Sequence, residues 1–318
     1  MVRRLTLLLS TPRIAPGLFT RDTWTALASA AHVLARDEDE TQLNAIQQSG
    51  IAAAHLGEQQ PAALARLLVD RTADGEVVWI GSADGDPGLT DALAAEVTSR
   101  QEPPDVEILV GSYDVPGARL LDLVAVMDRL RSPDGCPWDA EQTHESLVPY
   151  VIEETHELVE AIESGDRTHM VEELGDVLLQ VAFHARVAQE HPDSPFGIDD
   201  VAAGIVDKLV RRHPHVFADV DAGTAEEVAA NWEQIKAAEK PHRTSPLDGM
   251  PKGLSALASA NKAAGHLSTA GRYDLALAAA ADDDLGSRLF ALVLEARDKG
   301  QDPEAALRAA VRAVAGQL

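Results

Sequence analysis

The feature that most constrains the fold is the stretch 167–189, which is apolar around nearly the whole circumference of a helix. With about 3.6 residues per turn, only one narrow polar stripe interrupts this apolar surface. A helix with such a pattern is typical of a buried position. The stretch therefore predicts a helical core that encloses a short row of polar side chains: Glu173, Asp176, Gln180 and His184.

The preceding stretch, 144–164, predicts a second helix that carries a carboxylate on its apolar face. On a wheel of about 100° per residue, Glu154 falls inside the apolar arc, and Glu153 and Glu157 lie at its edge. The turn Gly165-Asp166 is short, so the two helices are expected to be antiparallel neighbours. Their acidic side chains would then share one site: Glu153, Glu154, Glu157, Glu173 and Asp176.

Five carboxylates at one site cannot all remain bare anions. Two carboxylates about 5 Å apart repel each other by about 3 kcal/mol at an effective dielectric constant of about 20. A hard divalent cation relieves the repulsion, and oxygen ligands select Mg²⁺ or Mn²⁺ over Zn²⁺. A Glu-Glu-x-x-Glu motif on one helix is often only a solvated face. The second acidic stripe, on a helix predicted to be buried, favours the metal site.

Positive charges that could hold a phosphate group gather near the end of a predicted helix at 198–212. They belong to Lys208, Arg211 and Arg212. Arginine is suited to bidentate contact with phosphate, but cations at the end of a helix also favour the helix dipole. Both interpretations fit the position of these residues.

Tryptophan side chains offer candidate surfaces for an aromatic ligand. Trp232 and Lys236 are one turn apart, so they share a helix face. There they could stack on a base and contact a phosphate, or they could be a buried tryptophan beside a solvated lysine. Trp138 lies in a turn rich in Gly and Pro, where it could contact a base, cover the site or only fill the loop.

Composition excludes several classes of partner. The formal net charge is −25, so the chain should repel both a nucleic-acid backbone and an anionic membrane surface. Cys136 is the single cysteine, which rules out an intrachain disulfide and fits a reducing, cytoplasmic compartment. The apolar run 5–9 is too short for a signal peptide or a membrane span. We interpret it as a buried first strand.

The pattern of residues 1–112 alternates between strand and helix, which predicts a small parallel α/β domain. Strands are expected at 5–9, 77–80 and 106–110, and a helix at 22–35 with Thr20 as its cap. A linker at 111–117 follows. The remaining chain is predicted to be all helical, so that the fold is α+β in two parts. Its helices are expected at 120–131, 144–164, 167–189, 198–212, 224–239, 282–299 and 303–314.

Six short motifs occur within 118–318. They are Gly135-Cys136-Pro137-Trp138-Asp139, Gln142-Thr143, Glu153-Glu154-x-x-Glu157, Glu173-Leu174-Gly175-Asp176, Lys208-Leu209-x-Arg211-Arg212-His213-Pro214-His215-Val216-Phe217 and Trp232-Glu233-x-x-Lys236. Taken together they resemble the MazG family of nucleoside triphosphate pyrophosphohydrolases, most strongly through residue 240. The resemblance implies an all-α pyrophosphohydrolase bundle completed by dimerisation or higher homo-oligomerisation, with a catalytic domain at 118–240.

The same resemblance implies an activity and roles for residues. The expected reaction is hydrolysis of NTP or dNTP at the α–β phosphoanhydride to NMP and pyrophosphate, as house-cleaning of aberrant or damaged nucleotides. Whichever of Glu153 and Glu154 the metal does not need could activate water. Substrate would contact Trp138 and Arg211. The resemblance further implies Mg²⁺ on Glu153 or Glu154, Glu157, Glu173 and Asp176, phosphate contacts from Lys208 and Arg212, and closure by Trp232 and Lys236.

Two further segments qualify this picture. Asp284-Leu285-Gly286-Ser287 echoes the second acidic motif but lacks its ligand set, so 245–318 is interpreted as a degenerate second MazG-like repeat, and one active site per chain is expected. Pro16-Gly17-Leu18 and Gly85-Asp86-Pro87 resemble a truncated tetrapyrrole-methylase domain. That domain is short, so we expect a structural or regulatory role without methyl transfer.

Other classes of function remain as alternatives to this hypothesis. One is hydrolysis of dUTP or phosphoribosyl-ATP within the same superfamily. Another is a non-catalytic helical scaffold, in which the acids are a surface feature. A third is a methyltransferase. The patterns do not decide base or sugar preference, nor dimer against tetramer.

Overall fold

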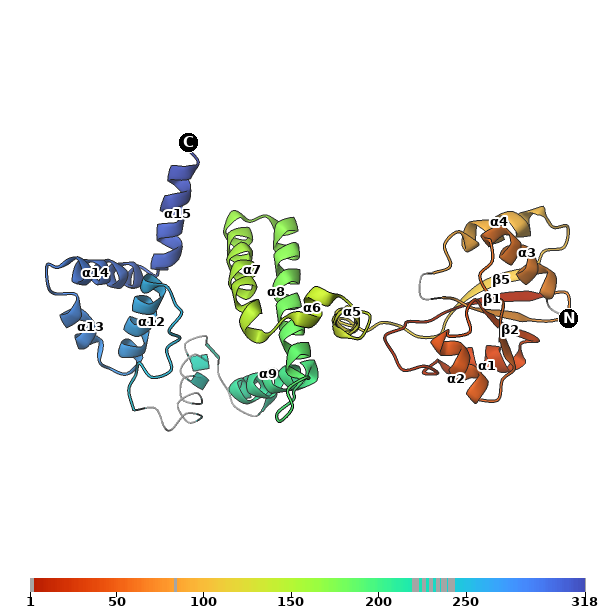
Figure 1. The fold of residues 1–318 in the computed structure, drawn as a ribbon, viewed down its shortest axis with the longest axis horizontal. Helices are drawn as coiled ribbons and strands as arrows, with labels where there is room; N and C mark the ends of the chain where they lie inside the picture. The colour runs from red at the N-terminus through yellow and green to blue at the C-terminus, as the bar shows by residue number, and fades with distance from the viewer. Residues whose placement is uncertain are drawn as a thin grey trace. The chain divides into compact units, whose positions relative to one another are not determined.

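The computed structural model describes residues 3–82, 85–218, 223–224, 227–228, 231–232, 235, 239 and 244–317. By its internal contacts the chain divides into two compact units, Met1–Ala203 and Gly204–Leu318. The first unit contains an α/β part followed by helices, and the described part of the second unit is helical (Figure 1). This confirms the predicted order of a small α/β region followed by a helical region.

The α/β part is built on a parallel sheet with the strand order β3-β2-β4-β1-β5. The central strands β4 and β1 pair in register, with Leu5 opposite Val77. β1 also pairs with β5, where Leu5 lies opposite Val106. The strands are β1 (Arg4–Leu9), β2 (His32–Ala35), β3 (Ala53–His55), β4 (Val77–Ile80) and β5 (Asp105–Val110).

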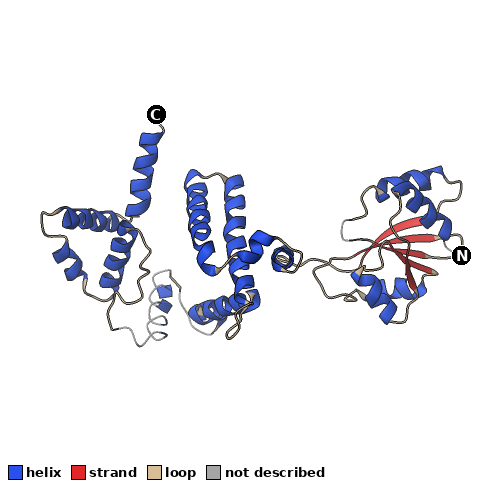
Figure 2. Ribbon diagram, in the orientation of Figure 1, coloured by secondary structure: helices blue, strands red, loops and turns tan. Residues whose placement is uncertain are grey.

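Helices cover both faces of this sheet (Figure 2). On one face lie α1 (Arg21–Ser29) and α2 (Thr41–Gln48), and on the other α3 (Pro61–Arg71) and α4 (Leu89–Ser99) (Figure 1). Strand β4 is buried along its whole length. Its successive side chains point to opposite faces of the sheet, so helices must cover both faces. Both faces therefore need apolar side chains, as in parallel sheets generally.

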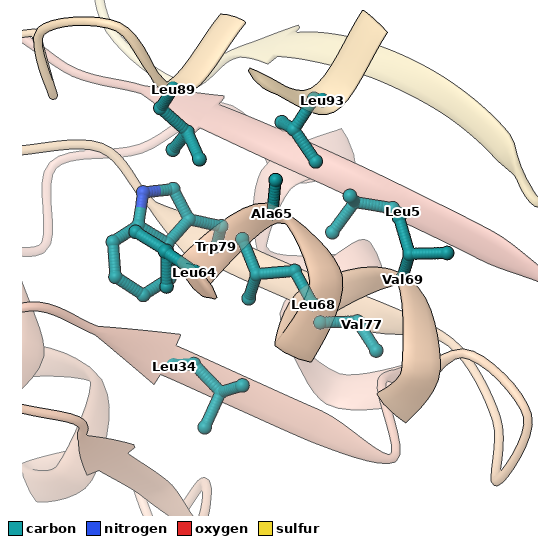
Figure 3. Packing of buried hydrophobic residues seen from close by; sticks show 10 residues of the cluster. All are labelled: Leu5, Leu34, Leu64, Ala65, Leu68, Val69, Val77, Trp79, Leu89 and Leu93. Carbon is teal, nitrogen blue, oxygen red and sulfur yellow. The ribbon is translucent and has the colours of Figure 1, made fainter. Parts of the chain in front are cut away.

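Two separate cores result from this arrangement. Val77 and Trp79 pack with α3 and α4 in the cluster drawn in Figure 3. Val78 and Ile80 pack with α1 and α2 in the second cluster. Every other residue of β4 thus belongs to the same core, which explains why this run of apolar and β-branched residues forms a strand.

The predicted helix at 22–35 is wrong over its second half. Helix α1 ends at Ser29 and β2 begins at His32. The alanine-rich sequence favours a helix locally, but Val33 and Ala35 are buried against the sheet and its helices, and this packing outweighs the local preference. The predicted cap is confirmed, because the side chain of Thr20 accepts a hydrogen bond from the Thr23 backbone N–H.

Four helices follow the α/β part within the first unit: α5 (Arg119–Arg131), α6 (Pro137–Glu141), α7 (His144–Ser164) and α8 (Arg167–Ala188). Thr143 and Ser146 form a capping box that starts α7, and Gly165 ends it with φ 74°. Asp166 then caps α8. Helices α7 and α8 lie side by side as a hairpin (Figure 1), and their predicted positions are confirmed.

The burial predicted for α8 is wrong for a single chain. One side of the helix packs into a core in which Phe183 and Ala182 meet Met127 and Leu147. The other side is open, with Val171 72% exposed and Leu174 51% exposed. Among the elements that the structure describes, α5 and α7 are the ones that pack substantially against α8, so part of its apolar circumference stays uncovered within one chain.

The division between the units falls inside α9 (Ile198–Arg212), which is followed by the short α10 (Pro214–Phe217). Four more helices follow among the described residues, and the first three of them share a small core of Ala264, Ala276 and Leu294. Most residues of the predicted helix at 224–239 lie outside those that the structure describes. The four helices are α12 (Ala256–Thr269), α13 (Tyr273–Ala279), α14 (Leu285–Asp298) and α15 (Pro303–Ala315), of which α12 and α13 were not predicted.

The echo of the acidic motif has a different structural role in the second unit. Asp284 is the N-cap of α14, where its carboxylate accepts hydrogen bonds from the backbone of Gly286 and Ser287. Glu173, by contrast, lies inside α8. The two motifs thus occupy different places in their helices.

Within the described parts of the chain, no helix is both long enough and apolar enough to cross a membrane.

Candidate metal centre

The structure brings three of the five predicted carboxylates into one cluster. Glu154, Glu157 and Glu173 each offer an oxygen atom, and these atoms lie within 4.8 Å of one another. Glu154 and Glu157 are one turn apart on α7, so they share a face of that helix. Glu173 reaches them from α8, the neighbouring helix of the hairpin.

Glu173 is the most enclosed member of this cluster, with 5% of its surface exposed. Its Oε1 lies 2.8 Å from the Nε2 atom of His169, one turn earlier on α8. Among the described residues, its Oε2 has no hydrogen-bond partner. An unsatisfied buried carboxylate oxygen is costly, so this atom is suited to a ligand.

The electrostatics of Glu154 connect all five predicted acids. Burial raises the pKa of the Glu154 carboxyl group, and the charges of Asp176, Glu157, Glu173 and Glu153 raise it further, in that order. Asp176 is half-buried and Glu153 is exposed. Hence Asp176 borders the three-carboxylate cluster, and Glu153 lies at its edge.

This donor set fits a hard divalent cation. It consists of carboxylate oxygens only, one of them buried without a partner, and its mutual repulsion would be relieved by positive charge. Glu154, Glu157 and Glu173 would hold the ion, with Asp176 nearby.

A cavity of about 270 Å³ lies along the two helices that carry the acids. Its walls are apolar except for three side chains, those of Thr155, Gln180 and His184. Thr155 directly follows Glu154 on α7. The apolar lining consists of Val151, Val177, Val181, Ala185, Phe196 and Val201.

His184, the last residue of the polar stripe on α8, forms a pair with His144. The Nδ1 atoms of His144 and His184 lie 2.8 Å apart, and the rings are stacked with centroids 5.1 Å apart. Burial lowers the pKa of His184, and the charge of His144 lowers it further. His184 was interpreted as a packed or hydrogen-bonding residue, which this contact confirms. The part played by His144 was not foreseen.

Trp138 lies on α6, half exposed, in edge-to-face contact with Tyr150 and Phe183. The loop that carries it is held by Arg131, whose guanidinium donates to the Gln142 carbonyl oxygen at 3.2 Å and forms an ion pair with Glu190 at 2.7 Å. The exposed ring could still meet a ligand, so its predicted role in substrate binding stays a prediction.

The predicted phosphate contacts lie in the second unit, where two of them already have a partner. Arg211 forms an ion pair with Glu239 at 2.8 Å, and Arg212 forms one with the same carboxylate. Arg212 also lies over the ring of Trp232, 5.2 Å from its centroid. Hydrogen bonds from Arg212 and then Arg211 lower the pKa of Glu239 to about 2. The two arginines are thus held by an internal carboxylate.

Of the other two predicted substrate-binding residues, Lys208 is exposed on α9, and Lys236 lies outside the described residues. Sequence reasoning missed Glu239, although its spacing from Trp232 is about two helical turns, so it would share a helix face with that ring. It also missed His169, which precedes Glu173 by one turn and could have been found by the same spacing.

Comparisons with known proteins identify the family that this chain resembles. Residues 142–217 match the model of the MazG nucleotide pyrophosphohydrolase domain. The chain is 42% identical over 211 residues to the nucleoside triphosphate pyrophosphohydrolase/pyrophosphatase MazG of Thermotoga maritima, covering 60% of this chain and 80% of that protein. It is 49% identical over 143 residues to the nucleoside triphosphate pyrophosphohydrolase of Escherichia coli, covering 44% and 54% of the two chains.

An uncharacterized 26.1 kDa protein of Streptomyces cacaoi is 54% identical over 235 residues, covering 73% of this chain and 94% of that protein. The crystal structure of a mazG-related protein from Thermotoga maritima aligns with 37% of this chain at 29% identity, with a TM-score of 0.31. The matched stretch 142–217 contains α7 and α8 with the whole acidic cluster. Because the chain is 42% identical to the Thermotoga maritima MazG protein and covers 80% of it, the chain belongs to the MazG family of nucleotide pyrophosphohydrolases.

Proposed function

We propose that this chain hydrolyses nucleoside triphosphates, NTP or dNTP, to the monophosphate and pyrophosphate with the help of Mg²⁺ or Mn²⁺. The observation that carries the proposal is the cluster of Glu154, Glu157 and Glu173, whose oxygens lie within reach of one ion. Relatives that are 45% and 49% identical to this chain over 206 and 143 residues are named nucleoside triphosphate pyrophosphohydrolases. The chain spans 63% of the Mycolicibacterium smegmatis relative and 54% of the Escherichia coli one.

In the proposed reaction a water oxygen bonds to the α-phosphorus, the α–β bridging bond breaks, and pyrophosphate leaves. A divalent ion, when bound, supplies positive charge that offsets the phosphate oxygens and lowers the pKa of water. Glu153, exposed on the same turn of α7, would accept the proton of the attacking water, because Glu154 is one of the three proposed ligands. Glu154 is the alternative base if the ion takes Glu153 in its place.

Lys208, Arg211 and Arg212 are proposed to contact the phosphates. Lys208 is exposed, whereas the two arginines would have to exchange the carboxylate of Glu239 for phosphate oxygens. Guanidinium groups bind both anions in the same geometry, which makes such an exchange chemically reasonable. Trp138, Trp232 and Lys236 remain candidates for further substrate contacts.

The experiment is a measurement of pyrophosphate release from a panel of triphosphates, with and without Mg²⁺. The panel includes dUTP and phosphoribosyl-ATP, which separates the related activities. Glu154→Gln should abolish most turnover in a folded chain, and Glu160→Gln, an exposed acid on the same helix, should not. Absence of turnover on every triphosphate would contradict the proposal and favour a helical scaffold.

Three finer statements belong to the same proposal. The exposed apolar side of α8, with Val171 and Leu174, supports a homodimer or a higher homo-oligomer. The free thiol of Cys136 is in keeping with a cytoplasmic location. The substrates would be aberrant or damaged nucleotides, with the N-terminal α/β part in a structural or regulatory role, as its resemblance to a truncated methylase domain suggests.

A further inference from the structure

The carboxylate of Glu173 is held by a neighbour on its own helix that does not belong to the acidic cluster. The Nε2 atom of His169 lies 2.8 Å from the Oε1 atom of Glu173. An ionised carboxylate only accepts hydrogen bonds, so the imidazole N–H is the donor. Residues four apart on a helix share a face, and this hydrogen bond therefore runs along α8 toward the cluster.

The two oxygens of Glu173 differ in their surroundings. Oε1 accepts the hydrogen bond from His169, whereas Oε2 is buried and has no partner among the described residues. The last torsion of a glutamate side chain is broad, so an unrestrained carboxylate turns easily. A hydrogen bond to Oε1 restricts this torsion and keeps Oε2 as the free acceptor.

His169 is itself fixed by the start of α8. Its backbone N–H donates to the Oδ1 atom of Asp166 at 3.1 Å, and Asp166 is the N-cap of the helix. A cap of this kind satisfies donors of the first helical turn that have no partner within the helix. Hydrogen bonds thus connect the cap to the backbone of His169 and the ring of His169 to Glu173.

The environment of His169 separates it from both the core and the proposed ligands. Its side chain is 40% exposed, so it can be replaced without opening a cavity in the core. It is absent from the set formed by Glu154, Glu157 and Glu173, although histidine is a possible ligand type. Residues that hydrogen-bond a ligand in this way orient it for the ion.

We propose that His169 is a positioning residue for the metal centre. Its hydrogen bond to Oε1 orients Glu173 so that Oε2 faces the ion shared with Glu154 and Glu157. This proposal rests on the proposed function, because it assumes the divalent ion. Without the hydrogen bond the carboxylate samples more orientations, and binding of the ion must then restrict a side chain that is more mobile.

The test is a calorimetric titration of the full chain with Mn²⁺. His169→Leu and His169→Gln both remove the imidazole, but only glutamine keeps an N–H donor on its side chain. His169→Leu should weaken Mn²⁺ binding by about tenfold or more, and His169→Gln should restore most of the affinity. His156→Leu, at an exposed position on α7, is the matched control and should bind as the wild type does.

A second measurement separates positioning from a purely structural role. The melting temperature of each protein is recorded with a chelator and again with saturating Mn²⁺, and the increase caused by the ion is compared. An ion that binds the folded chain raises this temperature according to its affinity. The increase should be smaller in His169→Leu than in wild type and His169→Gln. A structural role would lower both temperatures equally and leave the increase unchanged.

Failure of this proposal differs from failure of the proposed function. If the wild type releases pyrophosphate but His169→Leu binds Mn²⁺ as the wild type does, or both variants lose affinity equally, the positioning role is overturned and hydrolysis stands. If the wild type binds Mn²⁺ but hydrolyses no triphosphate, the proposed function fails, and weaker binding in His169→Leu alone would still support the role of His169. No Mn²⁺ binding by the wild type would overturn both.

Discussion

At the scale of single residues, the site is defined by buried polar groups that lack a hydrogen-bond partner or a compensating charge. Glu173 keeps one oxygen without a partner among the described residues, and Glu154 has a raised pKa because of burial and neighbouring acids. Burying such groups costs free energy. A cation at the acids would offset that cost, so these residues should be more stable with a bound cation than without one.

The pair of His144 and His184 predicts how stability depends on pH. Burial and the charge of His144 lower the pKa of His184 in the folded chain, so between that value and the ordinary 6.5 the unfolded state binds more protons. Stability is then present above the ordinary pKa and is lost as pH falls through the folded pKa. Denaturant unfolding at about pH 7.5 and about pH 5.5 measures the loss.

His184→Asn should reduce the change in unfolding free energy between the two pH values. His156→Asn, at an exposed position on α7, serves as the control and should leave the pH dependence as it is in the wild type. An equal pH dependence in wild type and His184→Asn would show that another group is responsible.

At the scale of elements, the α7–α8 hairpin sets the distance between the two acidic stripes. Its boundaries could be predicted because the signals are local: Thr143 begins α7, and Gly165-Asp166 ends it and begins α8. Strand β2 could not, since the helical preference of an alanine-rich segment yields to packing in the sheet. The pairing of Arg212 with Glu239 depends on contacts distant in sequence, which periodicity does not reveal.

The turn of the hairpin should be sensitive to a side chain at Gly165. Its φ of 74° lies in the left-handed region, although an added Cβ would meet no atom within 4 Å. Gly165→Ala should therefore lower the free energy of unfolding by about 1 kcal/mol through backbone strain alone. Denaturant unfolding of the two proteins measures the difference.

Gly204, inside α9, provides a control of opposite sign. An added Cβ there also meets no atom within 4 Å, and the backbone is helical. Gly204→Ala should raise the free energy of unfolding by up to about 1 kcal/mol. A gain in stability from Gly165→Ala would contradict the turn geometry.

At the scale of the whole molecule, the sequence indicated an α/β part, a helical part and the helices that carry the acids. It was wrong about the burial of α8, because an apolar circumference does not say whether the covering surface belongs to the same chain. The open side of α8, with Val171 and Leu174, is where we propose that a second copy of the chain packs. The oligomeric state is a consequence that can be measured.

We expect light scattering to give a homodimer or higher oligomer for the wild type. Val171→Lys should shift it toward the monomer, because a charge would be buried against apolar side chains. Val126→Lys, on α5 and 54% exposed, is a control for the loss of an exposed valine. A wild-type monomer at micromolar concentration would contradict the expectation.

The central claim is that Glu154, Glu157 and Glu173 act together as ligands of one divalent ion. Calorimetric titration of the full chain with Mg²⁺ or Mn²⁺ tests it directly, with Glu173→Gln compared against Glu172→Gln, its exposed neighbour on α8. We predict that Glu173→Gln weakens binding by at least about tenfold and that Glu172→Gln binds as the wild type does. Equal binding by both variants, or no binding by the wild type, would contradict the account.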